Sequence, residues 1–311
     1  MNVFKKNAKN RISGNIKDNW QLFILQLPAL VLFFVFCYIP MYGVIIAFKE
    51  FNSNKGIWAS PWVGLRNFKF FFASQDAARL IRNTVLYNLW FLLIGTFFAV
   101  LVALMLYNLR RRYLVKTYNT IMILPKFMSI VLISFIVYAL LNPSSGIVNN
   151  MLISMGKEPI DWYSKPEAWP GILTIVHLWQ NTGWSSIIYY AALMGINPEL
   201  FEAAEIDGAS KYLQTVKIAV PEIMSLITIQ VILALGSTFQ GDFGLFYQVP
   251  RNVATLYPTT DIINTYTFRA LMSASMSKSA AVGLMQSVVG IVLIVSVNLI
   301  VKKLSPENSL F

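Results

Sequence analysis

Charged residues are scarce in this sequence. They make up 13% of its 311 residues, whereas 56% of the residues are hydrophobic. A typical soluble domain carries about 25% charged residues. The composition therefore excludes an ordinary soluble domain and predicts a protein that crosses a membrane several times.

Cysteine and histidine are almost absent. The one cysteine, Cys37, and the one histidine, His177, both lie inside apolar runs. A disulfide framework and a cysteine-based metal site are thereby excluded, and a lone histidine is more typical of a structural hydrogen bond than of a metal ligand. The sequence also lacks the glycine-rich Lys-Ser/Thr loop that binds nucleotide phosphates. We therefore expect no cofactor or metal in this chain, and no ATP hydrolysis by it.

Acidic residues are few as well, 14 against 25 lysines and arginines, which gives a net charge of +11. Nucleic-acid binding would require these bases to form a basic face on a soluble fold. Instead they gather at the ends of apolar runs, for example at Arg111 and Arg112 after the second run and at Lys302 and Lys303 after the last. This pattern is typical of anchoring at the cytoplasmic membrane surface, so we expect contact with lipid and no nucleic-acid partner.

Six apolar segments meet or approach the length of about 20 residues that a helix needs to span a bilayer. They are Leu22–Phe48, Thr84–Leu106, Thr120–Leu141, Gly171–Met194, Glu222–Phe239 and Ala280–Val301. An even number of spans places both termini on one side, and the positive-inside rule makes that side the cytoplasm. The expected fold class is therefore all-α, a polytopic membrane protein with a cytoplasmic segment over 1–21, a transmembrane domain over 22–303 and a cytoplasmic tail over 304–311.

One stretch places bases on the side that this topology assigns to the outside. The segment Asn67–Arg82 mixes phenylalanines with Lys69, Arg79 and Arg82. Such a mixture is typical of a helix that lies along the lipid headgroups. We therefore predict an interfacial helix there, between the first and second spans.

The loop over residues 195–221 contains the signals for two short helices. It reads GINPELFEAAEIDGASKYLQTVKIAVP. Asn197 is a good N-cap, and Pro198 suits the first helical position. Gly208 can adopt the left-handed conformation that ends a helix. We expect a second helix over about 209–220, leading into Pro221 at the start of the fifth span.

The first of these helices combines small, apolar and acidic side chains. Ala203 and Ala204 allow close approach of another backbone, and the acidic Glu202, Glu205 and Asp207 can meet basic residues. An acidic surface on the cytoplasmic side disfavours contact with anionic lipid. The pattern therefore predicts a helix that docks into a groove of a cytoplasmic protein.

The same loop resembles the signature of bacterial binding-protein-dependent ABC importer permeases, which is Glu-Ala-Ala, three residues, Gly, nine residues and Ile-x-Leu-Pro. The matching positions are Glu202, Ala203, Ala204, Gly208, Ile218 and Pro221. Val220 replaces the leucine. The resemblance implies the type I permease fold of ABC importers and a loop that couples to the ATPase through these residues and Asp207.

The resemblance also implies a set of partners and a location. It implies a second homologous permease subunit, two copies of an ABC ATPase that bind ATP and Mg, and an extracytoplasmic solute-binding protein, in the bacterial cytoplasmic membrane. The stretch Trp62–Phe68 is similar to the maltose-type carbohydrate permeases. Tyr38–Gly43 and Asp261–Arg269 resemble permeases for complex polysaccharides and large oligosaccharides. A saccharide cargo is thus expected, with peptides or amino acids as the alternative.

Polar and aromatic residues within the spans are candidates for a substrate path, because polar groups in lipid normally face a bundle interior or water. The candidates surround Gly183, which we interpret as a break in the fourth span. They are Trp179, Gln180, Asn181, Trp184, Tyr189 and, from the fifth span, Gln230. Hydrogen bonds between helices and interfacial aromatic anchoring are the alternative.

Two other classes of membrane protein fit less well. A secondary carrier or channel would call for paired carboxylates or ion-binding broken helices within the membrane, and the spans contain almost no acids. A membrane-embedded enzyme would need a nucleophile, an acid/base pair or a metal cluster. The sequence therefore favours a non-catalytic permease that works by alternating access.

Overall fold

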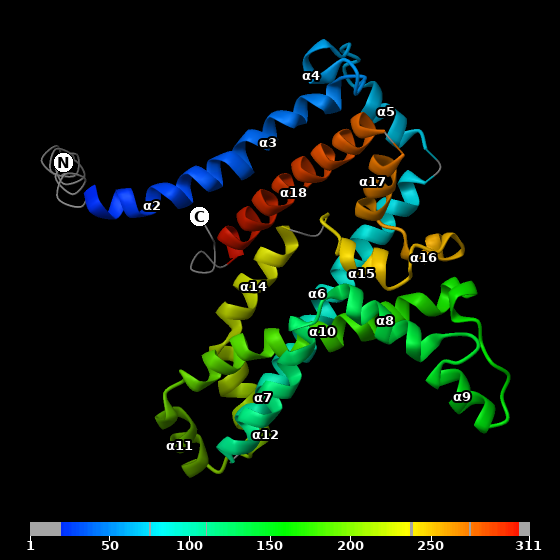
Figure 1. Ribbon diagram of the computed structural model, residues 1–311. Coiled ribbons are helices and arrows are strands. Elements are labelled where there is room, and N and C mark those ends of the chain that lie inside the picture. Colours follow the sequence, from blue (N-terminus) through cyan, green and yellow to red (C-terminus); the bar gives the residue numbers. More distant parts are fainter. Residues whose placement is uncertain (1–19, 75, 110, 237–238, 274, 305–311) are drawn as a thin grey trace, which may run out of the picture.

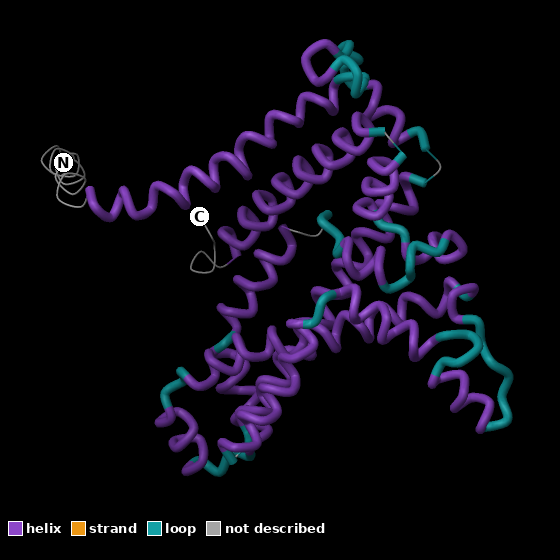
Figure 2. The backbone as a smooth tube through the Cα atoms, viewed as in Figure 1, coloured by secondary structure: helices purple, strands orange, loops and turns teal. Residues whose placement is uncertain are grey.

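The computed structural model describes residues 20–74, 76–109, 111–236, 239–273 and 275–304. Over these ranges the chain is helical between its loops, apart from an isolated antiparallel bridge between Lys49 and Trp62 (Figure 2). The all-α class is confirmed. The predicted terminal segments, 1–21 and 304–311, lie almost wholly outside the described residues.

The first predicted span is a continuous helical rod. It consists of α2 (Trp20–Phe33), the π-helical η1 (Phe34–Tyr38), α3 (Ile39–Met41) and the 3-10 helix η2 (Tyr42–Phe48). The change to π geometry comes just before Pro40, which lacks the amide hydrogen that would bond one turn back. None of the residues of α2 is buried, and only the η2 end of the rod packs extensively, on the last helix of the chain (Figure 1).

The predicted interfacial helix is wrong as a single element. Only α5 (Arg66–Phe72), which follows α4 (Gly56–Ala59), is a separate helix. The chain then turns, with Ser74 donating its hydroxyl to the carbonyl of Phe71, and α6 (Ala77–Tyr107) begins seven residues before the predicted start of the second span at Thr84. The second half of the expected interfacial segment is thus the first part of the longest helix.

The third predicted span, Thr120–Leu141, is not one straight helix. The helices α7 (Arg112–Phe127) and α8 (Ile130–Leu141) meet at 99°. Ser129 adopts an extended conformation and caps α8, its hydroxyl accepting a hydrogen bond from the amide of Leu132. A cap of this kind starts a new helix where the apolar run alone predicts continuation.

The fourth predicted span is α10 (Trp169–Met194), which follows α9 (Ile147–Ser154), η3 (Trp162–Ser164) and η4 (Pro166–Ala168). It runs without interruption through Gly183, so the predicted break there is wrong. The helix packs most extensively on α6 and next on α7. Gly183 is buried at the contact with α7, where the missing side chain lets the two backbones approach.

The remaining elements include the loop over 195–221 and the helices that follow it to the end of the described chain. They are α11 (Pro198–Ile206), α12 (Lys211–Gln214), η5 (Thr215–Ala219), α13 (Val220–Glu222), α14 (Met224–Gly236), α15 (Phe243–Gln248), η6 (Ala254–Leu256), α16 (Tyr257–Thr260), α17 (Ile263–Met272) and α18 (Met276–Leu304). The fifth predicted span bends by 54° between α13 and α14. The last helix, α18, packs on η2, α5, α14 and α17 (Figure 1).

Three helical segments in the described part of the chain are long and apolar enough to cross a membrane, namely Trp20–Phe48, Ala77–Tyr107 and Met276–Lys303. Counting each of the two bent pairs as one span raises the number to five. The continuous α10, with 26 residues, is not among them. Its polar residues lower its hydropathy, and some of them line the candidate site.

Candidate functional site

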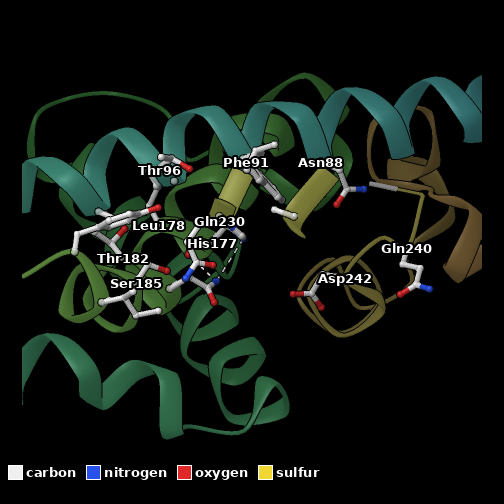
Figure 3. A pocket seen from close by; sticks show the side chains of 17 residues that line it. Asn88, Phe91, Thr96, His177, Leu178, Thr182, Ser185, Gln230, Gln240 and Asp242 are labelled. Atoms are coloured by element: carbon white, nitrogen blue, oxygen red, sulfur yellow. Dashed lines mark hydrogen bonds between the residues drawn. The ribbon is translucent and has the colours of Figure 1, made fainter. Parts of the chain in front are cut away.

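A cavity of about 370 Å³ lies between α6, α10, α14 and the segment that leads into α15 (Figure 3). Its lining alternates aromatic and aliphatic side chains with polar ones. The polar members are Asn88, Thr96, His177, Asn181, Thr182, Ser185, Tyr189, Gln230, Gln240 and Asp242. Figure 3 shows Gln240 and Asp242 on one side of the cavity and Thr182 and Ser185 on the other. The cavity thus offers hydroxyls and amides together with aromatic faces.

His177 is held in place by its neighbours in the cavity wall. Its ring stacks on Phe91, with centroids 4.1 Å apart and planes 9° apart. Asn181 donates its amide to the carbonyl oxygen of His177 at 3.0 Å. In turn, Lys126 of α7 donates its ammonium group to the side-chain oxygen of Asn181 at 2.7 Å. A polar chain therefore links the end of α7 to the cavity.

Thr182 adds an uncommitted group to this wall. Its hydroxyl is buried and makes no hydrogen bond with the described part of the chain. A buried hydroxyl without a partner costs free energy unless something else satisfies it. Thr182 is therefore a candidate for contact with a bound hydroxyl or water.

The structure brings three of the predicted path residues to the cavity and leaves three away from it. Asn181, Tyr189 and Gln230 line it. Trp179, Gln180 and Trp184 do not. Trp179 and Trp184 are 44% and 46% exposed, on other faces of α10, and Trp184 meets Phe127 edge-on.

Sequence reasoning missed six polar residues in or near the cavity, namely Asn88, Thr96, Thr182, Ser185, Asp242 and Lys126. Asn88 and Thr96 are polar residues spaced eight apart on α6, which places them near one face. Asp242 follows the fifth predicted span and caps α15 by accepting from the amide of Leu245. Lys126 is a charged residue inside the third predicted span, and that property alone would have identified it.

The prediction of two short helices in the loop over 195–221 is confirmed, although the second begins at Lys211 and contains the π-helical turn η5. The side chain of Asn197 accepts a hydrogen bond from the amide of Glu199 at 3.2 Å and caps α11. Gly208 has a φ of +77° and ends that helix. Ser210 then caps α12 by accepting from the amide of Leu213. Local capping chemistry therefore determines this hairpin.

Most of the loop's predicted coupling residues are accessible, and α11 contains no buried residue. Glu202, Ala203, Asp207, Gly208 and Pro221 are exposed, whereas Ala204 and Ile218 are half-buried. The side chain of Ile206 is 88% exposed. Phe201 packs α11 against the end of α6, where its ring centroid lies 5.8 Å from that of Tyr107.

A hollow of about 660 Å³ lies between α11, α12 and the end of α6. Glu202, Glu205 and Lys211 are its charged lining residues. The carboxylate of Glu205 lies 3.7 Å from the ammonium group of Lys211. Glu202 makes no ion pair within the described residues, so its charge is available to a partner.

At the far end of α6, a buried carboxylate joins three elements. Asp261 accepts from Arg269 of α17 at 2.6 Å and lies 3.6 Å from Arg79 of α6. Its second oxygen accepts from the hydroxyl of Thr265 at 2.6 Å. Asn83 donates its amide to the backbone carbonyl of Asp261 at 3.0 Å. These contacts fix α17 on the start of α6.

The sequence matches the family described as binding-protein-dependent transport system inner membrane component over residues 92–307. The polygalacturonan/rhamnogalacturonan transport system permease protein YteP of Bacillus subtilis is 33% identical over 309 residues, which cover 98% of this chain and 95% of that protein. Protein LplB of the same organism is 34% identical over 293 residues, which cover 94% and 91%.

Solved structures are similar over the same extent. The crystal structure of a bacterial ABC transporter involved in the import of the acidic polysaccharide alginate has a chain that is 32% identical, with a TM-score of 0.86, covering 95% of this chain and 99% of that one. A structure of the alginate transporter in complex with an alginate pentasaccharide-bound periplasmic protein gives 32% identity and a TM-score of 0.85 over 95% and 98%. The chain therefore belongs to the family of inner membrane components of binding-protein-dependent transport systems, and it is a multi-pass, non-catalytic permease subunit of an ABC transporter.

Proposed function

We propose that this chain is one permease half of an ATP-driven importer that moves fragments of acidic polysaccharide across the bacterial cytoplasmic membrane. The observation that carries the proposal is the similarity, over nearly the whole chain, to proteins whose names state polygalacturonan/rhamnogalacturonan transport and alginate import. Polygalacturonan and alginate are polymers of uronic acids. The proposed cargo is therefore a short chain of sugar rings that carry carboxylates.

The cavity between α6, α10 and α14 is the proposed part of the cargo's path in this subunit. Its volume of about 370 Å³ lies within the range of about 300–1,000 Å³ that small-molecule sites occupy. The amides of Asn88, Asn181 and Gln230 can bond sugar hydroxyls, and Tyr189 offers an aromatic group. This lining of amides, hydroxyls and an aromatic group suits a saccharide, the cargo that we propose over peptides or amino acids.

The loop over 195–221 is the proposed contact with the ATPase. The motif positions Glu202, Ala203 and Gly208 lie on an exposed hairpin, and Ile206 projects from it into solvent. An exposed apolar side chain beside an unpaired carboxylate suits a groove with basic residues at its edge. Ile218 and Pro221 belong to the second half of the hairpin, which leads into α14.

We further propose six spans with both termini in the cytoplasm. In this topology α10 is the fourth span, and the bent pairs α7–α8 and α12–α14 are the third and fifth. A helix as polar as α10 is tolerated in a membrane where it lines a path or packs between other helices. The positive-inside rule supports the orientation, because Arg111, Arg112, Lys302 and Lys303 then lie on the cytoplasmic side.

The remaining partners follow from the family. One chain supplies only part of a translocation path, so we propose a second homologous permease subunit, two copies of the ATPase, which bind ATP and Mg, and an extracytoplasmic solute-binding protein. ATP binding would close the ATPase pair and move the hairpin of α11 with it. The spans would then reorient the cavity from one side of the membrane to the other.

Reconstitution in liposomes with these partners tests the proposal. We expect ATP-dependent uptake of trigalacturonate that exceeds uptake of the neutral maltotriose and of a tripeptide. Uptake of the tripeptide but of neither saccharide would overturn the cargo assignment. Uptake that persists without the ATPase would overturn the mechanism and favour a secondary carrier.

A further inference from the structure

Lys126 is a charged residue in an otherwise uncharged part of the proposed membrane domain. It lies in the last turn of α7, inside the predicted third span. The helix that α7 packs on, α10, and the next helix along the chain, α8, contain no lysine, arginine, aspartate or glutamate. Of the other helices that line the cavity, α14 contains none and α6 has none beyond Arg82. A lysine at such a position is costly in lipid unless it faces water, a partner or a ligand.

The one side-chain partner of Lys126 within the described residues is neutral. Its ammonium group donates to the side-chain oxygen of Asn181 at 2.7 Å, and it forms no ion pair there. The amide of Asn181 is also bonded to the carbonyl of His177, and both residues line the cavity. Lys126 is exposed and does not itself line the cavity, but its bond to Asn181 places the positive charge beside the cavity wall, with no ion-pair partner among the described residues.

The carboxylate that lines the cavity, Asp242, is committed elsewhere. One of its oxygens accepts from the amide of Leu245 at 3.0 Å and caps α15. Asp242 lies with Gln240 on the side of the cavity away from Thr182 and Ser185 (Figure 3). Asp242 and Lys126 do not form an ion pair, so Asp242 does not neutralise the charge of Lys126.

We propose that Lys126 is a specificity-determining residue that binds the carboxylate of a uronic acid ring as the cargo passes the cavity. The inference rests on the proposed import function and names the charge that this subunit uses for it. A primary ammonium donates three hydrogen bonds, so Lys126 can keep its bond to Asn181 and still bind an anion. A charge-assisted bond to a carboxylate is stronger than a hydrogen bond between neutral groups.

The test compares variants of Lys126 in the complete reconstituted transporter, with trigalacturonate as the cargo. Lys126→Gln removes the charge but keeps an amide that can donate to Asn181, and we expect uptake to fall about tenfold, the loss of one charge-assisted bond. Lys126→Arg keeps the charge, and we expect it to retain most of the uptake. Lys116→Gln removes an exposed lysine from the same helix and serves as the control, with uptake like the wild type.

Uptake by Lys126→Gln that equals the wild type would overturn the inference and leave the proposed function intact. Equal loss in Lys126→Gln and Lys126→Arg would also overturn it, because it would indicate a structural role for the contact with α10. Failure of the wild type to import trigalacturonate would overturn the proposed cargo and this inference together.

A second measurement covers the case in which Lys126→Gln does not assemble. Lys126→Cys is made in a Cys37→Ser background, because Cys37 is the only native cysteine. One preparation of this protein is treated with aminoethyl methanethiosulfonate, which restores a positive charge, and another with the neutral methyl reagent. We expect uptake to recover with the first reagent only. Equal uptake after both treatments would overturn the inference.

Discussion

Gly183 in α10 faces the backbone of Met122 in α7 so closely that a Cβ at Gly183 would overlap the carbonyl group of Met122. The helix continues undisturbed on both sides of this glycine. A glycine in mid-helix costs about 0.5–1 kcal/mol relative to alanine, so its presence here is explained by the approach of the two helices. The same contact places Lys126, one turn further along α7, beside Asn181.

Gly183→Ala is expected to destabilise the protein by about 1–3 kcal/mol, because the added methyl group forces α7 and α10 apart. The measurement is the midpoint of thermal unfolding of the purified transporter in detergent. Gly171→Ala is the matched control, since Gly171 lies in the same helix with nothing within 4 Å of the added Cβ. A shift of equal size in both variants would contradict the close-contact explanation.

The hairpin of α11 and α12 could be predicted from the sequence because its determinants are local. The cap at Asn197 and the positive φ at Gly208 depend on the residues themselves and on their immediate neighbours. The fixed spacing of the motif residues also indicated the family, independently of the helix caps. No tertiary contact had to be known for either step.

The cavity could be predicted only in part, because the polar residues of α10 face several directions. His177, Asn181 and Ser185 follow each other at intervals of four and share the cavity face. Trp179 and Trp184 lie outside that stripe and are exposed. A count of polar residues in a span cannot separate these sets, whereas their helical spacing can. The 99° bend after Phe127 depends on tertiary packing as well as on the cap at Ser129.

Glu202→Lys is expected to abolish ATP-driven uptake while leaving the protein in the membrane. The substitution would place a positive charge against a basic partner and cost about 2 kcal/mol or more of binding free energy. The measurements are uptake in liposomes and the amount of ATPase that co-purifies. Glu158→Lys reverses an exposed charge in the loop between α9 and η3 and is expected to behave like the wild type. Wild-type uptake by Glu202→Lys would refute the coupling proposal.

Gly208→Val is expected to loosen the attachment of the ATPase. At a φ of +77° a β-branched side chain is strained by about 1–2 kcal/mol, so α11 would no longer end where the docking surface requires. Co-purification of the ATPase measures the effect. Gly208→Asn is the control, because asparagine tolerates the left-handed conformation and is expected to restore most of the attachment. If the same amount of ATPase co-purifies with Gly208→Val and with Gly208→Asn, the left-handed turn is not what positions α11.

Arg269→Met is expected to destabilise strongly the packing of α17 on the start of α6. Asp261 is buried, and Arg269 is its nearest cationic partner, at 2.6 Å. Removing that partner leaves a buried carboxylate with Arg79 at 3.6 Å, and a broken buried pair typically costs about 3–5 kcal/mol. The readout is the midpoint of thermal unfolding.

The control for this prediction is an arginine–carboxylate ion pair that is exposed to solvent. Arg66 and Glu50 are 3.2 Å apart, but their side chains are 67% and 59% exposed. Arg66→Met should therefore cost about 1 kcal/mol at most. Equal shifts of the unfolding midpoint for Arg269→Met and Arg66→Met would mean that burial of Asp261 does not control how stably α17 packs on α6. A large shift for Arg269→Met alone would tie the anchoring of α17 on α6 to this one carboxylate.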